Sequence, residues 1–471
     1  MLKSVDKVLG NNPGELMFGW ARDLFPFNRS LSGQGVRDTL LYIKRIIPSL
    51  NIRSVSSGTR AFDWVVPNEW EITDAYLSDL NGNKIISFQE NNLHVVGYSE
   101  PVNKIISREE LEQHLYSLPE QPTAIPYVTS YYKKTWGFCI SHNQRSTLGS
   151  GPFKVVIVSK LFSGNLHYGE LYIKGKSKQE VLLSTNICHP SLANNEISGP
   201  VILTALAKIL SSTRNTEFSY RILFLPETIG SIYYISRNIR SMKKNIIAGW
   251  TLTCMGDDNE FSFVPSRSEN SLANRVSKLA LSNQGNVKMY SWLDRGSDER
   301  QYCAPGVDLP VASIMRSKYG EYAEYHTSLD NLEFISREGL VGSLKMMQNV
   351  ISIVESNSVY KPTIKCEPQL SKRGLYPALS IKNKKSQVLD LKNQMNVLSY
   401  VDGKIDLIEI VEKSKVHWEE VILIVKNLEE NDLINKSSKK LNFLRLIIET
   451  ICNFRNFNYV KLMSRLPKNL F

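Results

Sequence analysis

The sequence is poor in cysteine and has no long apolar run. Its six cysteines are scattered through 471 residues without a CxxC pair, so we expect reduced, mostly buried thiols, as in cytoplasmic proteins. No apolar run approaches the roughly 18 residues that a membrane span requires. The N-terminal segment MLKSVDKVLGNN has no apolar h-region, so no secretory signal is predicted. These absences predict a cytoplasmic protein without a membrane span.

Motifs of several enzyme classes are also missing. No GxGxxG loop or phosphate-binding P-loop follows a strand-like run, so nucleotide binding has no support. No GxSxG nucleophile elbow is present. Cys188 is next to His189 in sequence, but adjacency alone does not make a cysteine a nucleophile.

The chain is long enough for two or three domains. Its composition, 42% hydrophobic and 22% charged, is ordinary for a soluble globular protein. Residues 1–52 show helical periodicity, whereas residues 55–148 hold short strand-like runs between Gly, Asn and Pro. From residue 155 to 355, strands alternate with helices, beginning with VVIVS at 155–159.

This alternation predicts an α/β fold with a mainly parallel sheet and helices on both faces. We therefore predict three parts: a discontinuous core (1–54 and 151–359), a β-rich insert (55–150) and a small C-terminal domain (360–471).

The C-terminal domain shows the pattern of a winged helix. Residues 399–434 indicate a strand followed by two helices. Winged helices often read DNA, but the second predicted helix carries Glu419, Glu420, Glu429 and Glu430. Because a helix that faces phosphates should not be acidic, we predict a protein-contact module that binds no specific nucleic acid.

The chain ends in a basic segment. The net charge is +11, and residues 436–471 hold eight Lys or Arg and one acid. Such a segment suits nucleic acid, an anionic membrane surface or an acidic protein face, or is only a solvated helix face. An apolar stripe at helical spacing runs through it: Leu441, Leu444, Ile447, Ile448 and Ile451. Since such stripes are mostly buried within the protein or in a dimer, we expect a homo-oligomer.

Four predicted strands of the core end in residues suited to a hydrolytic metal site. VLLSTNI is followed by His189, RILFLP by Glu227 and AGWTLTCMG by Asp257, and the segment after DLPVASIMR contains His326. Ligands bind at the carboxyl ends of strands in open α/β sheets. One histidine there is more often an ordinary hydrogen-bonded loop residue, so the metal prediction rests on all four strand ends together.

The segments ANNEISG, PETIGS, TCMGDD and YHTSLDN resemble the motifs of co-catalytic zinc aminopeptidases, in the same order. Further segments, among them FDWVVPNEWEI, NNLHVVGYSEPV, ICHPSLAN and KRGLYP, resemble bacterial aminopeptidase-like proteins often encoded with surface-polysaccharide genes. The resemblance extends from about residue 15 to about residue 435. It implies a zinc-aminopeptidase-like sheet with a β-rich insert and a C-terminal winged helix.

The resemblance also implies roles for individual residues. His189, Asn195, Asp257 and His326 occupy metal-ligand positions. Glu227 occupies the position of the general base, which takes a proton from a water whose pKa the metal has lowered.

Three positions depart from the family's pattern. Asn195 stands where a carboxylate bridges two metals, Thr228 replaces a second carboxylate, and Ser191 replaces the Asp that orients the first histidine. Two divalent ions about 3.5–4 Å apart need an anionic bridge, so we predict one zinc at most. The alternative prediction is that the site binds no metal. Glu196 is close enough to reach in, but the neighbour of a loop ligand usually points the other way.

Further residues are candidates for binding substrate. They lie just before a predicted strand or beside His326: Asp298, Glu299, Arg300, Glu324 and Tyr325. The acids would hold the free ammonium of a substrate; alternatively, they form a surface ion-pair network around Arg300 and Arg316. In the insert, Tyr131, Tyr132 and Trp136 either narrow the pocket or fill a small β core.

We therefore predict a metal-dependent, aminopeptidase-like hydrolase. It would cleave an amide next to a free amine in a small aminoacyl or N-acyl conjugate, in the setting of polysaccharide biosynthesis. The alternative is a catalytically impaired descendant that binds a ligand or a protein, because the bridging position is Asn195.

Overall fold

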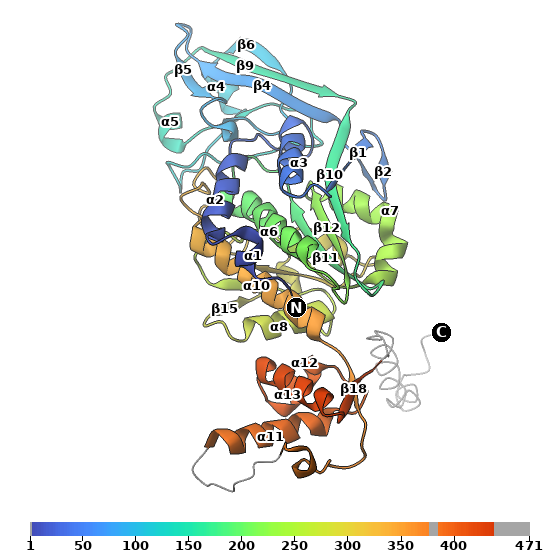
Figure 1. The fold of residues 1–471 in the computed structure, drawn as a ribbon. Coiled ribbons are helices and arrows are strands. Elements are labelled where there is room, and N and C mark those ends of the chain that lie inside the picture. The colour runs from blue at the N-terminus through green and yellow to red at the C-terminus, as the bar shows by residue number, and fades with distance from the viewer. Residues whose placement is uncertain (1, 376–384, 438–471) are drawn as a thin grey trace, which may run out of the picture. The chain divides into compact units, whose positions relative to one another are not determined.

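The computed structural model describes residues 2–375 and 385–437, and the chain divides into two compact units, Met1–Glu355 and Ser356–Phe471 (Figure 1). The apolar stripe predicted at residues 441–451 lies outside the described residues. Among the described residues, no helix is both long enough and apolar enough to cross a membrane.

An eight-stranded sheet forms the centre of the first unit. Its strands are, in spatial order, β1 (Asn51–Ser56), β10 (Asn165–Ile173), β12 (Ser219–Leu225), β11 (Glu180–Asn186), β13 (Ile246–Leu252), β16 (Val311–Met315), β14 (Phe261–Val264) and β15 (Val287–Met289). The four central strands, from β12 to β16, are parallel, while β10 and β14 join them antiparallel. All residues of these four strands are buried, as expected for parallel strands covered on both faces. The predicted α/β fold is confirmed.

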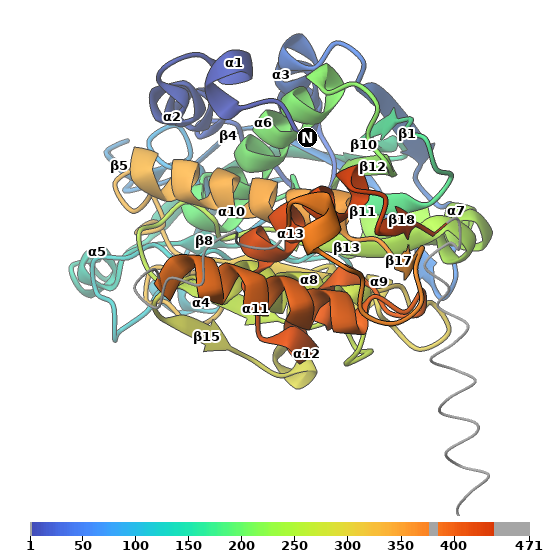
Figure 2. The ribbon, with the colours of Figure 1, turned by 60° about the horizontal axis from the view of Figure 1, so that its bottom comes forward.

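Helices cover both faces of the sheet (Figures 1 and 2). One layer contains α2 (Pro13–Leu24), α3 (Gln34–Ile46), α6 (Ser198–Ser212) and α10 (Arg337–Ser356). On the other side, α7 (Ile229–Asn245) and α9 (Glu299–Tyr302) share a core with the sheet, in which Tyr234 and Tyr302 pack with Leu182 and Leu223. Helix α8 (Leu272–Leu281) packs on β13 and β16.

A second sheet forms the insert. Its order is β5 (Lys84–Ser87), β4 (Glu69–Ser78), β9 (Phe153–Phe162) and β6 (Val102–Ile106). The run at 155–159, predicted as the first strand of the main sheet, lies instead in β9. The reason is packing: alternate residues of β9, Val155 and Ile157, are buried with Leu77 and Phe138 in the insert's own core. The smaller sheet therefore extends past residue 150 to Phe162.

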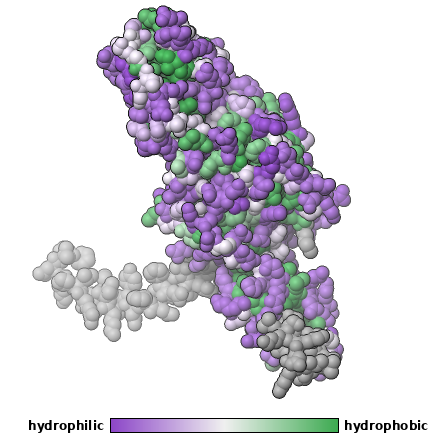
Figure 3. Space-filling model, turned by 90° about the vertical axis from the view of Figure 1, so that its left-hand side faces the viewer, coloured by the Kyte–Doolittle hydropathy of each residue, from purple (hydrophilic) through white to green (hydrophobic). Residues whose placement is uncertain are grey.

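The outer side of the insert is more exposed. Its apolar side chains there include Leu80, Ile105 and Val158. Figure 3 shows apolar groups where the insert forms one end of the first unit, on an otherwise mostly hydrophilic face.

The second unit contains β17 (Tyr360–Pro362), α11 (Lys385–Tyr400), α12 (Leu407–Ser414), α13 (Trp418–Glu430) and β18 (Ile434–Lys436), and β17 pairs with β18. The strand predicted to begin at residue 399 is wrong, because α11 continues to Tyr400. Val397 and Val401, four residues apart, are both buried, which is helical spacing. The two predicted helices are present as α12 and α13.

Candidate active site

Loops at the carboxyl ends of the parallel strands carry the predicted metal ligands and the predicted general base. The loop after β11 holds His189 and enters a π-helical turn, Ala193–Ile197, in which the N–H of Ile197 lies 3.1 Å from the carbonyl oxygen of Leu192. Such wide turns are frequent at functional sites. The turn directs Asn195 and Glu196 into the interior, where they are 5% and 1% exposed.

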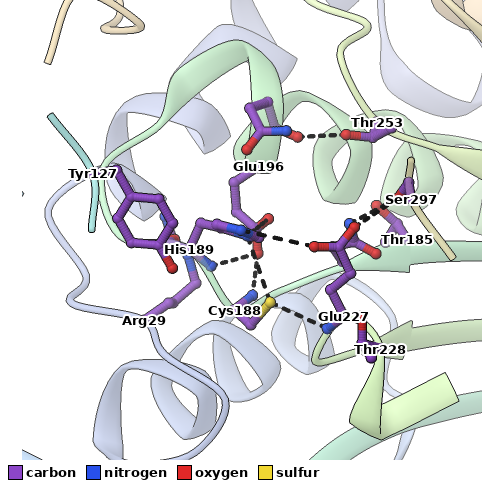
Figure 4. A network of polar contacts seen from close by, with 12 residues as sticks. Arg29, Tyr127, Thr185, Cys188, His189, Glu196, Glu227, Thr228, Thr253 and Ser297 are labelled. Atoms are coloured by element: carbon purple, nitrogen blue, oxygen red, sulfur yellow. Dashed lines mark hydrogen bonds and ion pairs between the residues drawn. The ribbon is translucent and has the colours of Figure 1, made fainter. Parts of the chain in front are cut away.

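Glu196 faces His189, so the prediction that it points away is wrong. Its Oε2 lies 2.7 Å from Nδ1 of His189, and its Oε1 accepts the backbone N–H of His189 at 2.8 Å and that of Cys188 (Figure 4). The wide π turn brings the carboxylate back over the preceding loop. Glu196 thus supplies the carboxylate beside His189 that Ser191 does not.

A buried arginine fixes the other side of this loop. Arg29 is 2% exposed, and its Nε donates to the carbonyl oxygen of His189 at 2.9 Å, while Nη1 donates to that of Leu24 at 2.7 Å (Figure 4). Burial lowers the pKa of Arg29 to about 10, against the attraction of Glu196. The guanidinium therefore stays charged at neutral pH and offsets the buried carboxylate.

Glu227 lies on the opposite edge of the His189 ring from Glu196. Its Oε2 is 3.8 Å from Nε2 of His189, and Ser297 donates to its Oε1 at 2.9 Å (Figure 4). The pKa of Glu227 is raised, chiefly by burial. Burial lowers the pKa of His189, but the neighbouring Cys188 and Glu196 raise it, with a net rise well above its ordinary value. Without a bound cation, His189 therefore favours its protonated form, with Glu196 at Nδ1 and Glu227 on the side of Nε2.

His326 lies beside His189. The two ring centroids are 5.3 Å apart, and the Tyr127 ring lies edge-on to both at 5.1 Å. Tyr325 stacks on His326 at 3.9 Å. Burial, followed by the charge of His189, lowers the pKa of His326 to about 3. His326 is therefore neutral, and its buried Nε2 has no hydrogen-bond partner among the described residues.

Asn195 also presents an unpartnered acceptor. Its backbone N–H donates to Asp330 at 3.0 Å, and its side-chain Nδ2 lies 3.7 Å from the sulfur of Cys254. Its buried Oδ1 has no hydrogen-bond partner in the part of the chain that the structure describes. The loop contacts thus fix Asn195 and leave one amide oxygen free to bind a cation or a donor.

The carboxylate of Asp257, a predicted metal ligand, is already hydrogen-bonded. Its carboxylate accepts from the Asn194 side chain at 2.7 Å and from the backbone N–H groups of Asn259 at 2.8 Å and Ser317 at 3.1 Å. These bonds hold three loops together, and they argue against the predicted metal role of Asp257. In the segment after β13, the side chain that faces Asn195 is Cys254.

The predicted substrate-binding acids have different surroundings. Glu299 is fully buried and accepts from Tyr319 at 2.6 Å, Gly296 at 2.9 Å and Ser313 at 3.1 Å, so its carboxylate has a structural role. Arg300 contacts Thr228 at an exposed position. Glu299 is therefore held by these hydrogen bonds and not by the predicted surface ion pair with Arg300.

Asp298 keeps a free oxygen. Its Oδ1 accepts from the N–H of Thr228 and the hydroxyl of Ser231, both at 2.8 Å, while no described residue binds the buried Oδ2. Burial, followed by the charge of Glu227, raises the pKa of Asp298 to about 7. Glu324 is only partly buried, in the loop that carries His326.

The site offers donor atoms of the kinds that a metal ion binds. Within the described part of the chain, the one cluster of three His, Cys, Asp or Glu ligand atoms within 4.8 Å of one another is Cys188, His189 and Glu196. That cluster surrounds Nδ1, which Glu196 already binds, so Nε2 is the nitrogen of His189 left for a metal. His189 Nε2, His326 Nε2 and Asn195 Oδ1 are donor types that divalent ions bind, and Asn195, at the predicted bridging position, is a neutral amide.

The insert reaches the site through one aromatic ring. Tyr127 contacts both histidines, and its hydroxyl lies 2.7 Å from that of Tyr131. Of the other rings singled out, Trp136 fills the insert's core and Tyr132 is exposed against Trp64. Sequence reasoning missed Tyr127, although it is in the same aromatic segment.

Comparisons with known proteins agree with the α/β fold and the winged helix described above. Residues 18–357 match a family model described as a domain of unknown function (DUF4910), and residues 358–436 match a winged helix-turn-helix model. A Clostridium acetobutylicum protein, named as a candidate polysaccharide biosynthesis protein with an aminopeptidase-like domain, is 41% identical over 427 residues, 89% of this chain and 96% of that protein.

Solved structures show the same fold. The crystal structure of a candidate peptidase from Clostridium acetobutylicum is 39% identical, with a TM-score of 0.85 over 92% of this chain and 99% of that one. A zinc aminopeptidase from Bacillus subtilis is 13% identical, with a TM-score of 0.53 over 72% of this chain and 94% of that one. The predicted resemblance is confirmed: the chain belongs to the DUF4910 family, with an aminopeptidase-like fold followed by a winged helix.

Proposed function

We propose that the protein hydrolyses an amide bond next to a free amine in a small aminoacyl or N-acyl conjugate, with one divalent metal ion, zinc by preference. The fold it shares with zinc aminopeptidases supports the reaction class. The name of the relative from Clostridium acetobutylicum supports a substrate from polysaccharide metabolism.

One observation carries the proposal. Two buried acceptors, His326 Nε2 and Asn195 Oδ1, have no partner in a site that also contains His189 and Glu227. Buried acceptors without a partner are costly and rare. A cation satisfies both, and imidazole nitrogens are ligands that zinc prefers.

The chain's own residues can then carry out the proton transfers. A zinc ion held by His189, His326 and Asn195 would polarise the amide carbonyl and lower the pKa of a water. Glu227, with a side chain 22% exposed and held by Ser297, takes the proton from the attacking water and returns it to the leaving amine. The raised pKa of Glu227 suits both transfers near neutral pH.

Two further features would select the substrate. The unpartnered Oδ2 of Asp298 is a candidate acceptor for the substrate's ammonium. Tyr127 and Tyr325 pack against the histidines and would limit the site to small groups.

Glu227→Gln tests the reaction. We expect cleavage of aminoacyl anilides or amino-sugar amides, with added zinc or cobalt, to slow by about 10²–10⁴ while metal content is unchanged. Glu180→Gln, which alters a buried ion pair between Glu180 of β11 and Arg221 of β12, is the matched control and should keep activity in the folded fraction. An active Glu227→Gln variant would remove Glu227 from the role of base.

The second candidate is a binding protein without catalysis. It is favoured by the neutral Asn195 at the bridging position and by the structural role of Asp257. If the wild type binds zinc and amine-bearing ligands in calorimetry but cleaves no member of the substrate panel, this candidate replaces the hydrolase.

A further inference from the structure

The surroundings of His189 are asymmetric. Nδ1 lies 2.7 Å from the Glu196 carboxylate, whereas Nε2 lies on the side of Glu227, 3.8 Å away. A metal-binding histidine generally donates its second ring N–H to a carboxylate or carbonyl, which fixes the tautomer and leaves the other nitrogen free to bind. The geometry therefore distinguishes the two nitrogens.

We infer that Glu196 is the positioning residue of the site: it accepts the Nδ1 proton of His189 and so presents Nε2 as the ligand nitrogen. In this chain Ser191, two residues after His189, cannot accept that proton as a carboxylate would. Its hydroxyl donates instead to the carbonyl oxygen of Phe25 at 2.8 Å.

Hydrogen bonds, a neighbouring charge and burial make Glu196 fit this role. Its Oε1 accepts the N–H groups of Cys188 and His189, which fixes the carboxylate on the same loop as the ring it orients. Arg29 binds the carbonyl oxygen of His189 and offsets the charge of Glu196. The carboxylate is almost completely buried, so water does not compete for Nδ1.

Glu196→Gln isolates this role. The glutamine oxygen can still accept the two backbone N–H groups, but its NH₂ group then faces Nδ1 and can only donate. Nδ1 must become the acceptor, and the ring proton moves to Nε2, where it blocks metal binding. We expect zinc affinity to fall about 10–100-fold.

Two measurements test the inference. Nitrogen NMR of the metal-free chain, at a pH where the ring is neutral, reports which nitrogen of His189 carries the proton; we expect Nδ1 in the wild type and Nε2 in Glu196→Gln. Calorimetry with zinc reports affinity. Glu180→Gln, also a buried glutamate in an ion pair, should change neither the tautomer nor the zinc affinity.

The zinc measurement rests on the proposed function, whereas the tautomer measurement does not, so the two can fail separately. A wild-type ring protonated at Nε2, or unchanged zinc affinity in Glu196→Gln, would overturn the inference. If the wild type binds no zinc but the tautomer changes as expected, Glu196 still positions His189, and the failure falls on the metal-dependent reaction.

Discussion

Asp298 should make the folded protein less stable as the pH rises. Burial, and after it the charge of Glu227, raises its pKa from 3.8 to about 7. Because the folded-state pKa lies above the unfolded value, Asp298 contributes stability that is fully present below about pH 4. That stability is lost as the pH rises through about 7.

The shift of about three pKa units corresponds to about 4 kcal/mol. Of this, about 3 kcal/mol is lost between pH 5 and pH 9. Asp298→Asn removes the titration and keeps an oxygen to accept from Thr228 and Ser231, both at 2.8 Å in the wild type. The variant should therefore gain stability relative to the wild type as the pH rises through this window.

Urea unfolding of both proteins with a chelator, from pH 5 to pH 9, measures the difference. Glu227→Gln is the control for the effect of the Glu227 charge. Removing that charge should lower the pKa of Asp298, so the loss of stability should end at a lower pH than in the wild type. Parallel stability curves for the wild type and Asp298→Asn would refute the raised pKa of the buried Asp298.

Three other outcomes follow from the site. Elemental analysis of the purified protein should give at most one zinc per chain, and Asn195→Asp should raise occupancy by restoring an anionic ligand; two tightly held ions in the wild type would contradict this. Asp257→Asn should leave zinc content unchanged but lower the free energy of unfolding by about 1–3 kcal/mol, because it disrupts buried hydrogen bonds; loss of zinc would restore Asp257 as a ligand. Tyr127→Ala should raise the rate on bulky substrates relative to small ones, while Tyr132→Ala, an exposed ring of the same segment, should not, and equal effects would assign Tyr127 a structural role.

The protein-contact interpretation of the winged helix stays a prediction. The exposed face of α13 contains Glu419, Glu430 and Leu423 but only one base, Lys426. This composition agrees with the argument against DNA binding, and a mobility shift assay at about 0.15 M salt would test it directly.

The sequence by itself determined the architecture of the sheet. Largely apolar runs such as VLLSTNI and RILFLP must be covered on both faces, and this predicts parallel strands between helices. The same runs locate the strand ends, and so His189 and Glu227, because ligands bind at that edge of such a sheet. The motifs that carried the family resemblance lie at these points.

Only the tertiary structure decided which neighbouring side chains face the site. Asp257 follows a strand as predicted, yet hydrogen bonds from other loops take up its carboxylate. Glu196 was expected to point away, yet a π-helical turn directs it to His189. Likewise, residues 155–159 are apolar enough for either sheet, and their place in the insert depends on contacts with Leu77 and Phe138. Apolar periodicity shows that a residue is buried, but the direction of a loop side chain depends on partners far away in the sequence.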